Sequence, residues 1–380
     1  MMNLPARSIR FLSVSLLVAA VQLTAPSLLQ GQIRWQDLVL TGGTSLESYS
    51  GNLPAVTISA VDSTDHVSAA VGELGARGRL LFFNHQERSL ELQFDGGLRQ
   101  LVARGFKVRD YASREWVGRS DLRYRERLSV LGDLWIETGF GARRVEDRPP
   151  MPLFLQPGYE TADGRIRLQF LPVRGLFFDF QLLGELADYP STPVTPQLDL
   201  LDRRALGAEA GVTFGPEWRI RLYSGLRFSE YRNQGTFDPD DPFRQDQTWS
   251  FGGNWSYSSS VYAQVGAEGT LNRSNSSRPE YDALSLRAVL STSLPGNLNL
   301  SFFANITEKW YKTQTDFARL VPGEEADNAS VVYLELARPL LVNLDGAVRF
   351  GWNRAETDIG NAYFERYGAT VLLRYRPWGR

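Results

Sequence analysis

Side chains alternate between apolar and polar through most of this chain, and this period of two restricts its fold more than any other feature. The clearest stretch is 218–229, where Leu222, Leu226 and Phe228 share one face of an extended strand. Arg221 and Arg227 share the opposite face. A helix, with 3.6 residues per turn, would mix the two sets. The pattern therefore predicts an all-β chain whose strands separate an apolar face from a polar one.

The same alternation predicts about sixteen strands. They are expected near 37–49, 67–83, 88–104, 115–128, 131–145, 159–171, 174–188, 200–214, 216–231, 247–257, 260–272, 281–294, 297–312, 329–338, 341–355 and 362–376. Short turns, such as those expected at Pro172–Val173 and Pro339–Leu340, alternate with longer polar loops, such as 189–199 and 313–328. This regularity is typical of a transmembrane antiparallel up-and-down β-barrel with short periplasmic turns and long outer loops. An even strand count places both termini on the periplasmic side.

The composition is compatible with a barrel in a membrane. Beyond the first thirty or so residues no stretch is long and apolar enough for a transmembrane helix, and the mean hydropathy is -0.26. Only a closed barrel lets such a chain span lipid, because half of each strand faces water. The net charge of -2 shows no basic excess for nucleic acid. The absence of Cys excludes disulfides, thiolate metal sites, a Cys nucleophile and lipid attachment at an N-terminal Cys.

The beginning of the chain has the features of a secretory signal. Arg7 and Arg10 precede an apolar run at 11–21, and small residues follow it. We expect a signal peptide at 1–31, cleaved between Ala25 and Gln32, and one barrel domain at 32–380. An uncleaved membrane anchor is the alternative.

The last predicted strand carries a second targeting pattern. A polar residue, then Gly two positions on, then alternating hydrophobic residues occur at Arg366, Gly368, Val371, Leu373 and Tyr375. This strand resembles the C-terminal assembly signal of bacterial outer-membrane β-barrel proteins, although Pro377-Trp378-Gly379-Arg380 follows where such strands usually finish on Phe or Trp. The resemblance, porin-like without a specific subfamily, implies an outer-membrane location, contact with membrane lipid and recognition by the barrel-assembly machinery.

Aromatic residues gather towards the ends of the predicted strands. They are Trp116, Tyr124, Trp218, Tyr231, Trp249, Tyr257, Trp310, Tyr311, Tyr363 and Tyr375. We interpret them as two interfacial girdles. The alternative is that aromatic residues simply favour strands.

Charged residues dominate the polar faces of the predicted strands. The candidates for the wall of the lumen are Arg119, Arg123, Arg125, Arg143, Arg165, Arg167, Arg219, Arg221, Asp133, Glu137, Asp179 and Glu185. A barrel of sixteen strands is wide enough for an aqueous channel, and rings of Arg favour anions. Equally, the charges would pair between neighbouring strands and merely solvate the wall.

Catalytic and metal chemistry find little support. His66, beside Ser63 and Asp65, would sit near a barrel rim, and His85 would lie in a periplasmic turn. A rim lipid hydrolase needs a Ser activated by a base that a third group orients, and no partner Ser stands out. An acidic loop with Asp238, Asp240 and Asp241 does not fit the spacing of a calcium loop. We assign no catalytic residue, metal or cofactor.

Two expected outer loops, 50–65 and 146–158, carry apolar side chains. They would fold into the lumen, cap its mouth or contact a neighbouring subunit, so a homo-oligomer or an envelope protein partner stays open.

The leading functional hypothesis is a porin-like channel for passive passage of small hydrophilic solutes. The alternatives are a plugged structural barrel that binds other envelope proteins, a rim lipid hydrolase, and a soluble periplasmic β-protein.

Overall fold

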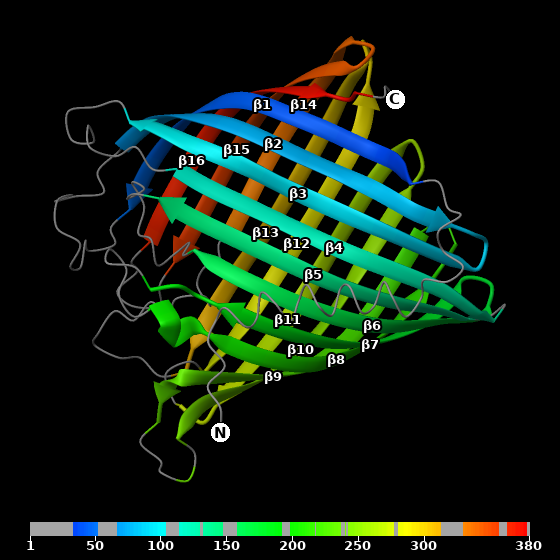
Figure 1. The fold of residues 1–380 in the computed structure, drawn as a ribbon, viewed down its shortest axis with the longest axis vertical. Helices are drawn as coiled ribbons and strands as arrows, with labels where there is room; N and C mark the ends of the chain where they lie inside the picture. Colours follow the sequence, from blue (N-terminus) through cyan, green and yellow to red (C-terminus); the bar gives the residue numbers. More distant parts are fainter. Residues whose placement is uncertain are drawn as a thin grey trace.

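Strand pairing closes on itself in the part of the chain that the computed structural model describes. The described residues are 33–51, 67–103, 114–129, 132–146, 158–191, 198–216, 218–236, 240, 242–276, 280–312, 330–356 and 363–377. Within them, sixteen antiparallel strands follow one another in chain order, and β1 (Arg34–Gly51) pairs with β16 (Tyr363–Tyr375) to complete a barrel (Figure 1). The predicted fold class, a sixteen-stranded up-and-down barrel, is confirmed.

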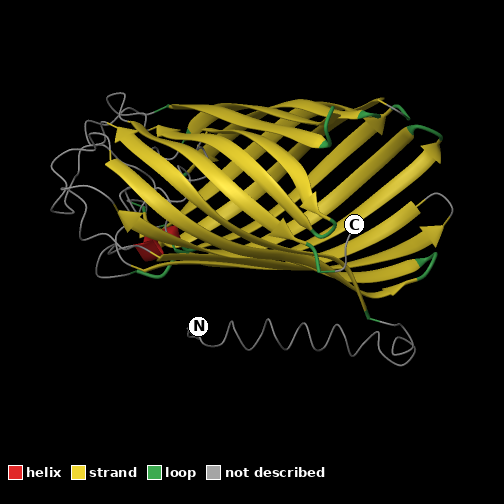
Figure 2. Cartoon of the chain, turned by 90° about the horizontal axis from the view of Figure 1, so that it is seen from above, coloured by secondary structure: helices red, strands yellow, loops and turns green. Residues whose placement is uncertain are grey.

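The remaining elements are β2 (Val67–Asn84), β3 (Arg88–Ala103), β4 (Arg114–Ser129), β5 (Gly132–Glu146), β6 (Tyr159–Val173), β7 (Leu176–Asp188), the 3-10 helix η3 (Leu198–Leu201), β8 (Arg203–Phe214), β9 (Trp218–Gly235), β10 (Phe243–Ser258), β11 (Val261–Ser274), β12 (Tyr281–Leu294), β13 (Leu298–Tyr311), β14 (Ser330–Leu341) and β15 (Leu344–Glu356). Figure 2 shows the barrel from another side, with η3 in red at one end. No helix in the described ranges is long and apolar enough to cross a membrane.

Two predicted turns were wrong, and both errors came from proline. Pro172 and Pro339 lie inside β6 and β14, at places where the pairing register shifts. Proline has no N–H to donate to the neighbouring strand. A bulge interrupts the pairing at this position, so the strand continues past the proline. The turns follow at 174–175, where Gly175 has a φ of 83°, and at 342–343.

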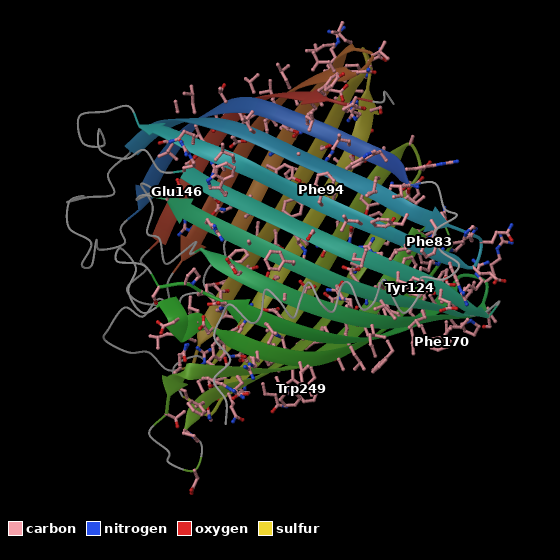
Figure 3. All side chains as sticks on the ribbon, viewed as in Figure 1. Phe83, Phe94, Tyr124, Glu146, Phe170 and Trp249 are labelled. Carbon is pink, nitrogen blue, oxygen red and sulfur yellow. The ribbon has the colours of Figure 1, made fainter. Side chains whose placement is uncertain are left out.

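The outer face of the barrel is apolar. Leu46, Leu206 and Val371 are 71%, 70% and 58% exposed, and many large apolar side chains like them point away from the barrel (Figure 3). A surface of this extent is far beyond what a water-soluble monomer exposes and is the expected face towards lipid. The soluble β-protein is therefore excluded.

Outward aromatic residues lie near both ends of the strands. Trp218, Tyr257 and Tyr375 are close to the hairpin turns, and Trp116 and Trp310 are close to the opposite end. In Figure 3, Tyr124 and Phe170 lie towards the hairpin turns and Glu146 towards the other end. This arrangement matches interfacial girdles on the two sides of a membrane.

Two members of the predicted girdles point inward instead. Tyr231 is 5% exposed beneath Arg244, and Tyr311 packs against Tyr281, its partner in the β12–β13 register. The alternation of each strand places both residues on its inner face, which their position near a strand end did not reveal. The side chain of Tyr363 lies outside the described ones.

Several predictions fall on residues outside the described ranges. They include the signal peptide 1–31, His66, and most of the apolar loops 50–65 and 146–158. The described end of the chain lies among the hairpin turns, since the Arg376 N–H donates to the Asn343 carbonyl in the β14–β15 turn.

Candidate functional site in the barrel lumen

The predicted lumenal residues occupy the face of each strand opposite the apolar one. Arg119, Arg123 and Arg125 follow one another at every second position of β4, and the register brings Arg123 opposite Glu137 of β5. Since the other face of these strands carries the exposed apolar side chains, the candidate site is the inner wall of the barrel.

A row of alternating charges crosses five neighbouring strands, β2 to β6. Arg79 lies 4.0 Å from Glu91, and Glu91 lies 3.2 Å from Arg123. Arg123 also contacts Glu137 at 3.0 Å, and Glu137 lies 4.0 Å from Arg165. Each carboxylate thus lies between two arginines, and the two carboxylates offset most of the positive charge of the row.

A second group spans a strand that has no side chain at the crossing point. Arg119 of β4 contacts Asp121 at 2.7 Å and reaches Asp163 of β6 at 2.9 Å. It passes over Gly139 of β5, where an added Cβ would lie 2.5 Å from the guanidinium. Glycine at this position is what allows charges two strands apart to meet.

The same arrangement recurs around Asp179 of β7, which is 7% exposed. Its carboxylate lies 2.8 Å from Arg221 of β9 and 3.4 Å from Arg167 of β6. Arg221 also contacts Glu209 at 2.6 Å. Gly211 of β8 lies beneath this group, because a Cβ there would come within 2.6 Å of Asp179 Oδ2.

Three carboxylates surround one guanidinium near the loop end of the barrel. Arg99 of β3 contacts Glu47 of β1, Glu73 at 3.2 Å and Glu115 at 3.5 Å. Arg143 of β5 joins the group through Glu115 at 2.8 Å. This cluster links β1 to β5 and shows that Arg143 belongs to a paired network.

Two further groups hold the remaining predicted charges of this region. Glu185 of β7 accepts from Arg203 at 2.9 Å and from Arg227 at 3.2 Å. Arg125 contacts Asp133 at 2.7 Å, close to the turn end of β4 and β5. We call the inner faces of β2–β9 the charged wall.

The inner faces of β10–β13 carry fewer charges, namely Arg244, Asp246, Glu268, Arg287 and Lys309, and we call them the neutral wall. Most of their side chains carry hydroxyl or amide groups: Thr248, Ser250, Asn254, Ser256, Gln264, Thr270, Ser285, Ser291, Asn299, Ser301, Asn305 and Thr307. The alternation in the sequence places these residues inward, although they were not among the predicted lumenal residues, which are all charged. The lumen is therefore polar around its whole circumference with an uneven distribution of charge.

A few inward arginines have no carboxylate within 4.0 Å in the part of the chain that is described. They are Arg77, Arg219, Arg287 and Arg366. Arg219 was among the predicted candidates, whereas Arg77 was missed. Its place two residues before Arg79 on β2 was the available signal.

The described rim near β7–β9 carries a small packed element. Leu201 of η3 packs against Ala187 and Tyr189, with Tyr159 beside them. Asp202 follows η3, and its carboxylate accepts from the Tyr189 N–H at 2.7 Å. Because Ala187 and Tyr159 belong to the inner register, η3 lies over the inner side of the wall at the mouth of the lumen.

The pKa of Asp202 is raised to about 6. Burial of the carboxylate is the main cause, and the neighbouring carboxylates of Asp188 and Asp199 add to it. Hydrogen bonds from the Tyr189 N–H and from Asn233, at 3.2 Å, act in the opposite direction. The rim therefore holds a carboxyl group that titrates near neutral pH.

The strand with the resemblance to an assembly signal closes the barrel. Val371, Leu373 and Tyr375 point outward, and Gly368 pairs with Glu47 of β1 on one side and with Gly351 of β15 on the other. β16 ends at Tyr375, before Pro377.

Of the remaining chemical candidates, His85 stays apart from the lumen. His85 lies in the β2–β3 turn, and its ring stacks on Phe83 with centroids 6.1 Å apart. No group of three or more potential metal ligands occurs among the described side chains. Asp238 and Asp241 of the acidic loop lie outside them.

Comparisons with known proteins give likenesses of fold only. No family model and no curated protein matches the chain. Among solved structures, OmpT of Vibrio cholerae, an outer membrane protein, has a TM-score of 0.40 at 10% identity, covering 91% of this chain and 99% of that one. OccD3 (OpdP) of Pseudomonas aeruginosa has a TM-score of 0.40 at 8% identity, covering 92% and 94%. A bacterial polysaccharide outer membrane secretin has a TM-score of 0.39 at 11% identity, covering 89% and 98%.

Similarity at this level carries no argument about activity. The class follows from the chain itself, whose closed barrel presents an apolar surface outward and a polar one inward. The chain folds as a β-barrel of the outer-membrane type.

Proposed function

We propose that this barrel is an outer-membrane channel for the passive passage of small hydrophilic solutes. Residues 1–31 are removed on export, and both termini of the barrel lie on the periplasmic side. The barrel-assembly machinery recognises β16, and the apolar outer face contacts lipid. The observation that carries the proposal is the lumen, whose polar side chains pair along the wall.

The geometry of the ion pairs favours an open lumen over a plugged one. Among the described lumenal ion pairs, the partners lie on the same strand, on adjacent strands or on strands separated by one, as with Arg119–Asp121 and Arg221–Asp179. Pairs that crossed the interior would have favoured the plugged structural barrel. A sixteen-stranded barrel with its charges held against the wall leaves room for an aqueous path.

The remaining charge favours anions. Four lumenal arginines have no carboxylate within 4.0 Å among the described residues: Arg77, Arg219, Arg287 and Arg366. The described lumenal carboxylates outside the ion pairs include Asp95, which lies opposite Arg77, and Glu268, which accepts from the Tyr223 hydroxyl. Unpaired cations along a polar path lower the energy of an anion more than that of a cation.

The test is single-channel conductance of the refolded protein in a planar bilayer, with reversal potentials measured in a salt gradient. We expect stable openings and a reversal potential that indicates preference for chloride over potassium. A folded, heat-modifiable barrel that never conducts would refute the channel and favour a structural barrel. No contact in the described residues favours the rim hydrolase.

A further inference from the structure

One exposed arginine stands alone on the neutral wall. Arg287 lies at the middle of β12, on the inner face, and no carboxylate of the described residues approaches it within 4.0 Å. In the closed order of strands, β12 is eight positions from β4, so it lies on the opposite side of the barrel from this strand of the charged wall. A buried or paired role does not account for Arg287.

Aromatic rings hold this guanidinium in place. Arg287 Cζ lies 5.5 Å from the ring centroid of Phe303, which stacks on Tyr333 at 5.1 Å with an interplanar angle of 18°. Arg349 Cζ lies 5.3 Å from the far side of this pair, over Tyr333. Cation–π contacts of this kind fix the plane of a guanidinium without using its N–H donors. Arg287 is therefore oriented while its donors stay available.

Arg287, Phe303, Tyr333 and Arg349 form a column of stacked side chains. The second arginine of this column is already paired with a carboxylate. Arg349 donates to Glu335 through two nitrogens, at 3.0 and 2.8 Å. Glu335 also accepts from Arg374 at 2.7 and 2.6 Å, so one carboxylate serves two guanidiniums. The column therefore keeps an excess of positive charge, and Arg287 is its available end.

The register neighbours of Arg287 are small or uncharged. Its register partner on β11 is Gly266, which has no side chain, and its partner on β13 is Asn305, whose amide lies on the same inner face. Glu268 is the nearby carboxylate of β11. It accepts a hydrogen bond from the hydroxyl of Tyr223 on β9, and β9 lies on the side of β11 away from β12. A guanidinium fork and an amide thus lie side by side on the inner face.

We propose that Arg287, with Asn305 beside it and Phe303 behind it, forms a binding site for small oxyanions in the lumen. The planar fork of arginine matches a carboxylate or phosphate bidentately, and the amide donates to a further oxygen. The solutes of the channel would accordingly be organic acids or phosphorylated compounds. This role in transport rests on the proposed channel function, whereas binding itself does not require conduction.

Binding is tested on the folded full barrel in a zwitterionic detergent, without a bilayer. Saturation-transfer NMR detects acetate and benzoate, and ³¹P line broadening detects inorganic phosphate. We expect binding by the unmodified protein and about tenfold weaker affinity for Arg287→Gln, because a charge-assisted bidentate contact is lost. Arg287→Lys, which keeps the charge without the fork, should lose affinity by a smaller factor. Saturation transfer to acetate and benzoate without broadening of the phosphate line would show that the site prefers carboxylates. Broadening of the phosphate line without saturation transfer would show that it prefers phosphate.

Arg219→Gln is the matched control, because it removes one unpaired lumenal charge from a position without the aromatic column. Unchanged affinity in this variant supports a specific site at Arg287. Equal losses in Arg219→Gln and Arg287→Gln would overturn the proposal in favour of a general lumenal charge, as would absence of binding by the unmodified barrel. A barrel that binds but never conducts would refute the channel alone, and one that conducts without binding would refute the site alone.

Discussion

The charged wall and the neutral wall enclose the same lumen but use their inward positions differently. On β2–β9, charges meet charges, as in the row from Arg79 to Arg165 and in the group around Asp179. On β10–β13, hydroxyl and amide groups meet one another, as in the Ser285–Thr307 pair at 2.9 Å. Most arginines of the charged wall are paired with carboxylates. On the neutral wall Arg244 is buried and paired with Asp246, whereas Arg287 is exposed and has no carboxylate within 4.0 Å among the described residues.

The number of charges on a wall therefore does not set its influence on a solute. Paired charges contribute to the cohesion of the wall, since most of these pairs join different strands in addition to the backbone hydrogen bonds. A single charge without a partner acts on the lumen. We therefore expect variants of the charged wall to alter stability, and variants at Arg287 to alter selectivity.

The largest expected effect is on the charged wall, in Asp179→Ala. Removing this carboxylate leaves Arg167 without its partner and Arg221 with Glu209 only. The free energy of unfolding should fall by about 2–4 kcal/mol. This loss is at or below the usual cost of breaking a buried ion pair, because water in the lumen partly solvates the charge that remains. The measurement is reversible urea unfolding in lipid vesicles, followed by tryptophan fluorescence.

Ser291→Ala on the neutral wall is the control for this measurement. It removes one hydroxyl from an exposed lumenal position and should change the free energy of unfolding by less than about 0.5 kcal/mol. If the two variants lost similar stability, the proposed cohesive role of the charged wall would be wrong.

A smaller loss is expected when a side chain is placed beneath the charges. In Gly139→Ala the new Cβ would lie 2.5 Å from Arg119 and 2.7 Å from Asp121 and Asp163, so these side chains must move apart. Overpacking of this kind costs about 1–3 kcal/mol. Gly164→Ala, on the outer face of the adjacent strand, has nothing within 4 Å of the new Cβ and should be nearly neutral. Equal urea midpoints for the two variants would show that the crossing over Gly139 is unimportant.

Selectivity should respond in the opposite order. The double variant Arg123→Gln/Glu137→Gln removes a pair from the charged wall without changing the net charge, so the reversal potential should hardly move. Arg287→Gln should lower the permeability ratio of chloride to potassium by about twofold, since one charge several ångströms from the path in water contributes about 0.5 kcal/mol. Raising the salt to 1 M should diminish the shift, because the Debye length falls to about 3 Å. A larger shift in the double variant than in Arg287→Gln would contradict the comparison.

The sequence predicted the barrel well because alternation reports directly on the two faces of each strand. Every inward residue of β12, including Arg287, could be assigned from its parity. Parity does not report which side chains meet, since pairs such as Arg119–Asp163 depend on a glycine in the intervening strand and on the register of three strands together. Turns at proline were misplaced for a related reason, because a bulge at Pro339 is a property of the pair β14–β15 and not of either strand alone.

The smallest expected effect concerns η3, which packs on the rim of the charged wall. The carboxyl of Asp202 has a pKa of about 6 in the folded rim, above its ordinary value of 3.8, so the folded rim binds its proton more tightly than the opened rim does. Stability of η3 should therefore be fully present below about pH 4 and decline as the pH rises towards 6. Amide hydrogen exchange at Leu200 and Leu201, corrected for intrinsic rates, should show greater protection at pH 5 than at pH 7.5. In Asp202→Asn, whose amide oxygen still accepts from Tyr189, this dependence should vanish. If the pH dependence persisted in Asp202→Asn, another group would be its cause. As a control, the hydroxyl and amide groups of the neutral wall do not titrate in this range, so protection of its strands should not change with pH.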